Sequence, residues 1–222
     1  MTTNIISAHN LCLARNGKTL LSGISLSMKA GETTIIMGPN GAGKTLLLSA
    51  LHGLVPVQSG TITTAPATQQ KMVFQKPILL RRSAKSHFVF TSGLKDEAAI
   101  ALWFERAGIA DKMSTSARHL SSGEAQKLAI ISALATKPNI LFLDEPTANL
   151  DTESRAEVEM LITSARQSGT AILMVTHALA QASRLADSFI YLQDGTIYDH
   201  STAARFLSGT RSDEASAFLS ER

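Results

Sequence analysis

The sequence has few of the features that mark secreted, disulfide-bonded or membrane-spanning proteins. Its single cysteine, Cys12, cannot form an internal disulfide or a thiolate metal cluster, which fits a reducing compartment. Residues 1–10 contain no Lys or Arg and no sustained apolar segment, which argues against a signal peptide. The longest mostly apolar stretch, residues 128–135, is far below the roughly 18 residues that predict a membrane-spanning helix. We therefore expect any contact with a membrane to be made through a partner protein.

The excess of positive charge is also small. The 222 residues include 21 Lys and Arg against 18 Asp and Glu, for a formal net charge of +3. Proteins that bind nucleic acid by neutralising phosphates concentrate basic residues on one surface, and the sequence has no basic tract longer than Arg81-Arg82. We therefore expect no nucleic acid among the partners.

The second half of the chain has the pattern of an α/β protein. Three predicted strands, each apolar throughout, are separated by two predicted helices. In chain order these are strand 140–143, helix 152–168, strand 171–176, helix 178–186 and strand 189–193. Because strands of this kind are buried on both faces, they predict a parallel sheet covered by helices on both sides.

The first half of the chain adds more strands and then a helical block. The predicted elements are strands 5–13, 24–28, 33–37, 60–63 and 72–74 and a helix over 43–52, which Gly53 ends. Residues 83–135 are mostly helical by pattern. In this block Ile100, Trp103, Phe104 and Ala107 recur on one helical face, which predicts packing into the core of the block.

An eight-residue segment after the predicted strand 33–37 matches the phosphate-binding pattern G-x-x-x-x-G-K-[ST]. It consists of Gly38, Pro39, Asn40, Gly41, Ala42, Gly43, Lys44 and Thr45. The glycines let backbone N–H groups wrap phosphates, and the N-terminus of the following helix adds a positive potential. Lys44 supplies a charge, and the Thr45 hydroxyl can bind Mg²⁺. A glycine-rich turn with a chance lysine is the alternative, but a strand before the loop and a helix after it favour a phosphate site.

Two carboxylates, Asp144 and Glu145, follow the apolar strand 140–143. Ligands of parallel sheets bind at the C-terminal ends of the strands, so these side chains are expected near the phosphate loop. Asp144 would then hold the Mg²⁺ shell, and Glu145 would polarise an attacking water as general base. An acidic pair at a strand end is also typical of a helix N-cap or a solvated turn, and the neighbouring phosphate loop favours catalysis.

A third motif narrows the class of nucleotidase. Leu120-Ser121-Ser122-Gly123-Glu124, at a predicted helix start, resembles the LSGGQ signature of the ABC ATPase family. The family's other landmarks occur along the chain in the expected order. Gln75, before the signature, matches the Q-loop, and after the signature residues 148–151 (Ala148-Asn149-Leu150-Asp151) match the D-loop and His177 the switch histidine. These matches run from about residue 5 to residue 200 of the chain.

The resemblance implies a homodimer in which two ATP molecules are sandwiched between two copies of the chain. ATP held by Lys44 and Thr45 of one subunit would be capped by Ser121 and Gly123 of the other, through amides at a helix N-terminus. By the same resemblance, Gln75 would sense Mg²⁺ and the attacking water, joining Thr45 and Asp144 as a metal-contacting residue. His177 would contact the γ-phosphate, although a histidine at a strand end is in isolation more often a satisfied structural residue.

Three positions depart from the family pattern. Ser122 replaces the first signature glycine and Glu124 replaces the usual glutamine, so a Cβ and a negative charge are added near the expected phosphate contact. Because Ser121 and Gly123 are retained, we expect activity to survive. Where the family places an aromatic residue on the adenine, this chain has Arg15, which either stacks its guanidinium plane on the base or is a solvated charge of the hairpin. Weak base contacts would predict loose discrimination between ATP and GTP.

The expected fold class is therefore α/β, with a P-loop nucleotidase core, an N-terminal antiparallel β subdomain and an inserted α-helical subdomain. The whole chain, residues 1–222, would form one ABC ATPase domain: 1–82 and 136–208 form the core and β subdomain, 83–135 the helical signature subdomain, and 209–222 a loose or helical tail. In such a domain, the apolar residues at 77–80 and 88–90 would in part face a permease, or would all pack inward.

The resemblance implies an ATP-hydrolysing subunit at the cytoplasmic face of a membrane, whose partners are integral permease subunits and, indirectly, a substrate-binding protein. The compact chain resembles bacterial importer subunits, and residues 73–83 and 51–54 are similar to the tungstate group of oxyanion importers. A soluble ATPase that clamps a macromolecule is the competing class, to be distinguished by co-purification. A GTPase or small-molecule kinase using the P-loop alone is a further alternative, which the signature and Asp144-Glu145 disfavour.

Overall fold

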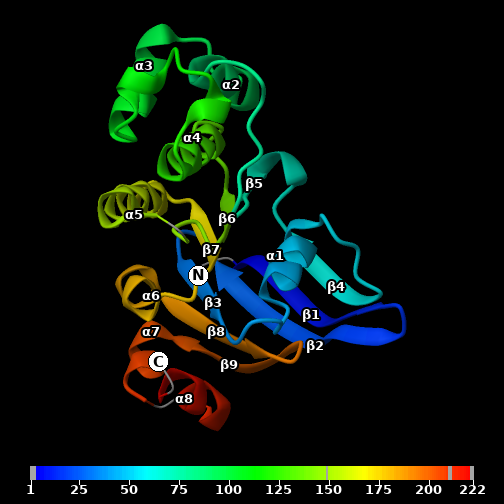
Figure 1. Ribbon diagram of the computed structural model, residues 1–222. Coiled ribbons are helices and arrows are strands. Elements are labelled where there is room, and N and C mark those ends of the chain that lie inside the picture. Colours follow the sequence, from blue (N-terminus) through cyan, green and yellow to red (C-terminus); the bar gives the residue numbers. More distant parts are fainter. Residues whose placement is uncertain (1–3, 149, 210–211, 221–222) are drawn as a thin grey trace.

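The computed structural model describes residues 4–148, 150–209 and 212–220, and these residues form two sheets and a separate block of helices (Figure 1). The larger sheet has six strands in the order β5-β6-β7-β3-β8-β9. These are β5 Gln70–Val73, β6 Ile140–Asp144, β7 Ala171–Val175, β3 Thr33–Met37, β8 Ser188–Gln193 and β9 Thr196–Thr202. All neighbouring strands from β5 to β8 pair in parallel, and β9 pairs antiparallel to β8.

Strands β6 and β7 are buried at every residue and β8 at its four middle residues, which confirms the prediction drawn from the uniform hydrophobicity of these three strands. Strand β3 is also buried throughout. Strand β9 and the short helix α7 Ala203–Leu207 were not among the predicted elements. Strand β9 is an edge strand with mostly polar, part-exposed residues, so it lacks the apolar pattern of its neighbours. The tight turn before it, at Asp194 (φ 47°) and Gly195 (φ 73°), is the local signal that marks this hairpin.

The smaller sheet is antiparallel, in the order β2-β1-β4, as expected for the N-terminal subdomain. Strands β1 Asn4–Arg15 and β2 Lys18–Lys29 are both longer than predicted, and β4 is Ser59–Thr64. Helix α1 Lys44–His52 packs between the two sheets, because its Leu47, Leu48 and Leu51 share one apolar cluster with residues of both. Gly53, at φ 88°, ends this helix as predicted.

A second apolar cluster lies on the other face of the larger sheet. It includes residues of α5 Thr152–Gln167, α6 Leu179–Leu185 and α8 Asp213–Ser220, which Figure 1 shows beside the sheet and below the helical block. Within the tail, helix α8 buries Ala215 and places Phe218 against Tyr191, with ring centroids 5.4 Å apart. The described part of the tail is therefore helical and packed.

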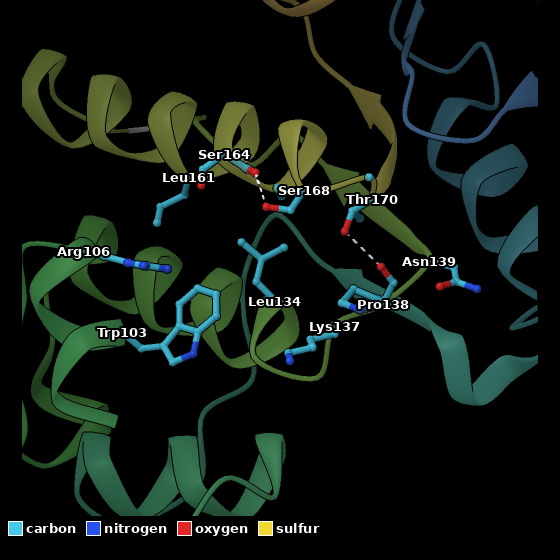
Figure 2. A pocket seen from close by; sticks show the side chains of 12 residues that line it. Trp103, Arg106, Leu134, Lys137, Pro138, Asn139, Leu161, Ser164, Ser168 and Thr170 are labelled. Atoms are coloured by element: carbon cyan, nitrogen blue, oxygen red, sulfur yellow. Dashed lines mark hydrogen bonds between the residues drawn. The ribbon is translucent and has the colours of Figure 1, made fainter. Parts of the chain in front are cut away.

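The helical block contains α2 Ala84–Ser92, α3 Glu97–Arg106 and α4 Ser122–Leu134, at the top of Figure 1. Two short 3₁₀ turns, η2 Ala110–Lys112 and η3 Ala117–His119, also belong to this block, and a third, η1 Ala67–Gln69, lies directly before β5. Of the predicted core face, Ile100, Phe104 and Ala107 are fully buried, whereas Trp103 is only partly buried. Trp103 lines a cavity of about 380 Å³ between this block and α5, where Arg106 lies 5.7 Å from its ring (Figure 2). None of the helices in the described residues is long and apolar enough to cross a bilayer.

Candidate functional site

The phosphate loop connects β3 to α1 and is shaped by its glycines. Gly38 has a φ of 149°, and a Cβ there would lie 1.9 Å from the Leu192 carbonyl oxygen, so no other residue fits without moving the backbone. Gly41 and Gly43 also have positive φ, of 82° and 99°. The N-terminus of α1 has no side-chain cap, so its first amides are oriented for an anion. The loop is therefore a backbone cradle with a helix dipole behind it.

Lys44 folds back over this cradle. Its Nζ donates hydrogen bonds to the carbonyl oxygens of Gly38 at 2.9 Å and Pro39 at 2.8 Å, and the residue is 6% exposed. This conformation holds the ammonium beside the phosphate loop. The geometry brings together the charge and the amides that a triphosphate requires.

Thr45 and Asp144 meet across the gap between α1 and the end of β6. The Thr45 hydroxyl donates to the Asp144 carboxylate, with Oγ1–Oδ1 and Oγ1–Oδ2 distances of 2.9 and 3.0 Å. Burial raises the pKa of Asp144 and the charge of Glu145 adds to this, while the Thr45 hydrogen bond and Lys44 oppose the shift. A hydroxyl and a buried carboxylate form an all-oxygen donor set that suits Mg²⁺, and the cation would compensate the buried charge. The residues present therefore fit this ion.

Glu145 lies one residue beyond Asp144, in a backbone conformation that non-glycine residues rarely adopt (φ 48°). Its backbone N–H donates to the Val175 carbonyl oxygen at 3.0 Å, which joins the turn after β6 to β7. Its carboxylate contacts both other expected catalytic residues. Oε1 lies 3.0 Å from Nε2 of His177, and Oε2 accepts a hydrogen bond from Nε2 of Gln75 at 3.4 Å. Three residues far apart in sequence thus converge on one carboxylate.

A cleft of about 480 Å³ joins these elements. It is lined by Leu20, Asn40, Gly41, Gly43, Lys44, Thr45, Leu46, Glu145 and His177. The phosphate loop, Glu145 and His177 therefore face one space. Arg15, at the exposed end of β1, is not among the lining residues, whereas Leu20 of β2 is. Leu20 was not predicted, because one apolar residue in an apolar strand has no distinguishing signal.

The signature residues lie at the start of α4, and none of them lines this cleft. Ser121 is the N-cap, and it forms a capping box with Glu124: Glu124 N–H donates to Ser121 Oγ at 3.3 Å, and Ser121 N–H donates to Glu124 Oε2 at 2.8 Å. Lys112 lies 3.5 Å from the other Glu124 oxygen. Partial burial opposes ionisation of Glu124, but these contacts with Ser121 and Lys112 outweigh it and lower its pKa. Glu124 is thus held locally as an anion.

Ser122 and Gly123 differ sharply in exposure. Ser122 is exposed, whereas Gly123 is buried against the first turn of α5. A Cβ at Gly123 would lie 2.6 Å from the Ser154 hydroxyl oxygen, so any larger residue here would have to displace the Ser154 side chain. In the neighbouring D-loop segment, Asp151 caps α5 by accepting from Ser154 N–H at 2.8 Å, and Asn149 lies outside the described residues.

Comparison with known proteins decides the family. The family described as ABC transporter matches residues 21–148, more than half of the chain, including the phosphate loop, Gln75, the signature segment and Asp144-Glu145. The chain belongs to the ABC transporter family. It is an ATP-binding subunit of such a transporter, and subunits of this kind are ATPases.

Individual relatives cover nearly the whole of this ABC subunit. The tungstate uptake system ATP-binding protein TupC of Peptoclostridium acidaminophilum is 35% identical over 86% of this chain and 96% of its own. The phosphate import ATP-binding protein PstB 2 of Natronomonas pharaonis is 32% identical over 92% of this chain and 82% of its own. A solved ATP-binding subunit of an ABC transporter has the same fold, with a TM-score of 0.86 at 24% identity, covering 97% and 99% of the two chains. The predicted family and fold class are confirmed.

Proposed function

We propose that this ABC subunit hydrolyses Mg-ATP between two copies of itself and thereby drives import through a membrane permease. The proposal rests on the observation that the expected ATP-contacting residues lie at two separate places on the subunit. The phosphate loop, Glu145 and His177 share one cleft, while the signature residues lie at the start of α4 outside it. A second copy placed so that its α4 N-terminus closes the cleft would supply amides to the γ-phosphate.

In this proposal the residues in and beside the cleft bind the phosphates, hold Mg²⁺ and position the attacking water. The loop amides and Lys44 bind the β- and γ-phosphates, and Thr45 and Asp144, with Gln75, would hold Mg²⁺, which when bound would supply charge neutralisation at the phosphates. Glu145 accepts the proton of the attacking water as the oxygen adds to the γ-phosphorus and the bond to ADP breaks. His177 and Gln75, already in contact with the Glu145 carboxylate, orient that water and the γ-phosphate.

The surface proposed to meet the permease lies beside the Q-loop. Ile78 is 85% exposed and Phe90 is 64% exposed, whereas Phe88 is buried and Leu79 and Val89 pack against the core. Exposed apolar side chains that lie together on one surface are typical of protein contacts. Arg82 stacks on Phe90, 4.7 Å from its ring, and adds positive charge at this surface. The apolar residues after Gln75 are thus divided between those packed inward and those exposed, and we propose that the exposed ones face the permease.

For the cargo we propose an oxyanion of the tungstate or molybdate type, delivered by a separate substrate-binding protein. The resemblance at residues 73–83 and 51–54 and the name of the first relative support tungstate, and the second relative's name refers to another oxyanion, phosphate. The chain itself would act at the cytoplasmic face of the membrane, held there by the permease. Uptake of labelled tungstate in a strain lacking this chain tests the cargo.

The decisive experiment for the proposed mechanism is Glu145→Gln with ATP and Mg²⁺, followed by size-exclusion chromatography. Without the general base we expect hydrolysis to fall by at least about 100-fold and ATP to remain trapped between two subunits as a stable dimer. Lys44→Ala in the same background is the matched control, because it should remove ATP binding and hence the dimer. A monomer at every ATP concentration would contradict the two-copy site. Co-purification with ribosomes or nucleic acid instead of a permease would contradict the transport role.

A further inference from the structure

A buried glutamine lies behind the turns that carry Glu145 and His177. Gln181, on α6, is 1% exposed, and its Oε1 accepts two hydrogen bonds. One comes from Thr147 Oγ1 at 2.9 Å and the other from Thr176 Oγ1, also at 2.9 Å. Both threonines are buried as well, at 5% and 4% exposed. Water therefore cannot easily replace these bonds, and the loss of the acceptor would leave two buried hydroxyls unsatisfied.

The two threonines belong to the two catalytic turns. Thr147 follows Glu145 by two residues in the turn after β6, and Thr176 directly precedes His177 in the turn after β7. Thr176 Oγ1 also accepts from the backbone N–H of Ala178 at 3.2 Å, which fixes the turn around the histidine. A single side-chain oxygen thus connects the turn of the proposed base to the turn of the proposed switch histidine.

The orientation of the Gln181 amide is set from its other end. Its Nε2 donates to Glu159 Oε1 at 3.1 Å, and Arg184 holds the same carboxylate through two bonds of 3.0 and 2.7 Å. If the amide were rotated by half a turn, its oxygen would face the carboxylate and its NH₂ would face both hydroxyls. Glu159 therefore selects the orientation in which the oxygen points to the threonines.

We propose that Gln181 is a positioning residue for ATP hydrolysis, which sets the separation of Glu145 and His177. It does not line the cleft, so it acts only through Thr147 and Thr176. Glu145 sits at φ 48°, a conformation that persists only where its surroundings hold it, and the bond from Thr147 anchors its turn. The inference rests on the roles proposed above for Glu145 and His177.

The test begins with Gln181→Leu, which keeps the approximate volume and removes all three hydrogen bonds. We expect kcat for ATP to fall by about tenfold to about 100-fold, because small displacements of reacting groups have effects of this size. The Kd for ATP in the presence of Mg²⁺ should stay within about twofold, because the phosphate loop is untouched. Gln167→Leu, at the exposed end of α5, is the matched control and should change neither value.

A charge-conserving exchange separates positioning from general packing. In Gln181→Glu two carboxylates face each other at hydrogen-bond distance, so one must be protonated and activity should fall as the pH rises. Adding Glu159→Gln returns a donor to the pair, and the double variant should recover kcat to within about threefold and lose the added pH dependence. Recovery of activity by this exchange would not follow from a purely structural role for the glutamine.

The outcomes distinguish this inference from the function on which it rests. If Glu145→Gln keeps normal turnover, the proposed mechanism fails and the positioning role fails with it. If Glu145→Gln is inactive but Gln181→Leu has wild-type kcat, only the positioning role is wrong. Should Gln181→Leu not fold, Thr147→Val and Thr176→Val remove the bonds one at a time, and unchanged kcat in both would overturn the inference.

Discussion

Replacing Asp144 by asparagine should make the ligand-free protein more stable while it removes the Mg²⁺-dependent part of the stabilisation by Mg-ATP. Asp144 is 7% exposed, and burial raises the pKa of its carboxyl, so the charged form is unfavourable in the folded state. Asparagine has nearly the same shape and still accepts a hydrogen bond from Thr45, but it carries no charge. The substitution thus removes the cost of the buried charge together with the ligand for a cation.

The size of the effect follows from the partners of the carboxylate. A buried charge without partners costs several kcal/mol, but Asp144 keeps the Thr45 hydrogen bond and the attraction of Lys44. We therefore expect a gain of about 1 kcal/mol in the free energy of unfolding, or about 2–4 °C in Tm for a domain of this size. Mg-ATP at about 100 times its Kd should stabilise the wild type by about 2.7 kcal/mol, and the variant should lose the Mg²⁺-dependent part.

Thermal unfolding of both proteins, with and without Mg-ATP, measures these values. The raised pKa gives the expected pH dependence: ionisation of Asp144 costs stability as the pH rises from the ordinary value to the raised one. The advantage of the variant should therefore be full at pH 8 and vanish toward pH 4. Glu105→Gln, at an exposed position, controls for the change in net charge. A ligand-free Tm for Asp144→Asn at or below wild type at pH 8 would refute the reasoning.

Two further predictions concern the base and the permease. Because Arg15 supplies no aromatic ring where the family places one on the adenine, KM values for ATP and GTP should agree within about threefold, and Arg15→Tyr should lower the KM for ATP by about threefold to tenfold through stacking. A strong ATP preference in steady-state assays of the wild type would contradict this. The double variant Ile78→Ser and Phe90→Ser should no longer be retained by the permease in pull-down assays but should keep the ATPase activity of the isolated subunit. The control Met160→Ser, on α5 and as exposed as Phe90, should keep both retention and activity. Retention of the double variant would place the docking surface elsewhere.

Much of the fold could be predicted because its determinants are local in the sequence. The strands β6 and β7 are apolar at nearly every position, and the phosphate loop needs glycines at fixed spacing between a strand and a helix. Both signals can be recognised in the sequence without knowledge of the tertiary structure. Strand β9 could not be predicted in the same way, because it lies at the sheet edge and its residues are mostly polar.

The finer parts of the site depend on contacts between distant segments. Glu124 was predicted only as an added negative charge, yet its carboxylate completes a capping box with Ser121 and pairs with Lys112. Gln181 has no sequence signal at all, since a glutamine within a short helix is an ordinary surface residue. Its position becomes informative only when the fold brings Thr147 and Thr176 to one atom.

The close approach of Gly123 to Ser154 has a mechanical consequence. A Cβ at Gly123 would lie 2.6 Å from the Ser154 hydroxyl oxygen and 3.0 Å from the Ser154 Cβ, so the start of α4 lies directly against the first turn of α5. If a second copy docks on the exposed Ser121 and Ser122, an inward displacement of the start of α4 would press on α5, whose cap Asp151 lies a short segment after the proposed base. The contact between these two helix starts would then couple binding at the protein surface to the position of Glu145.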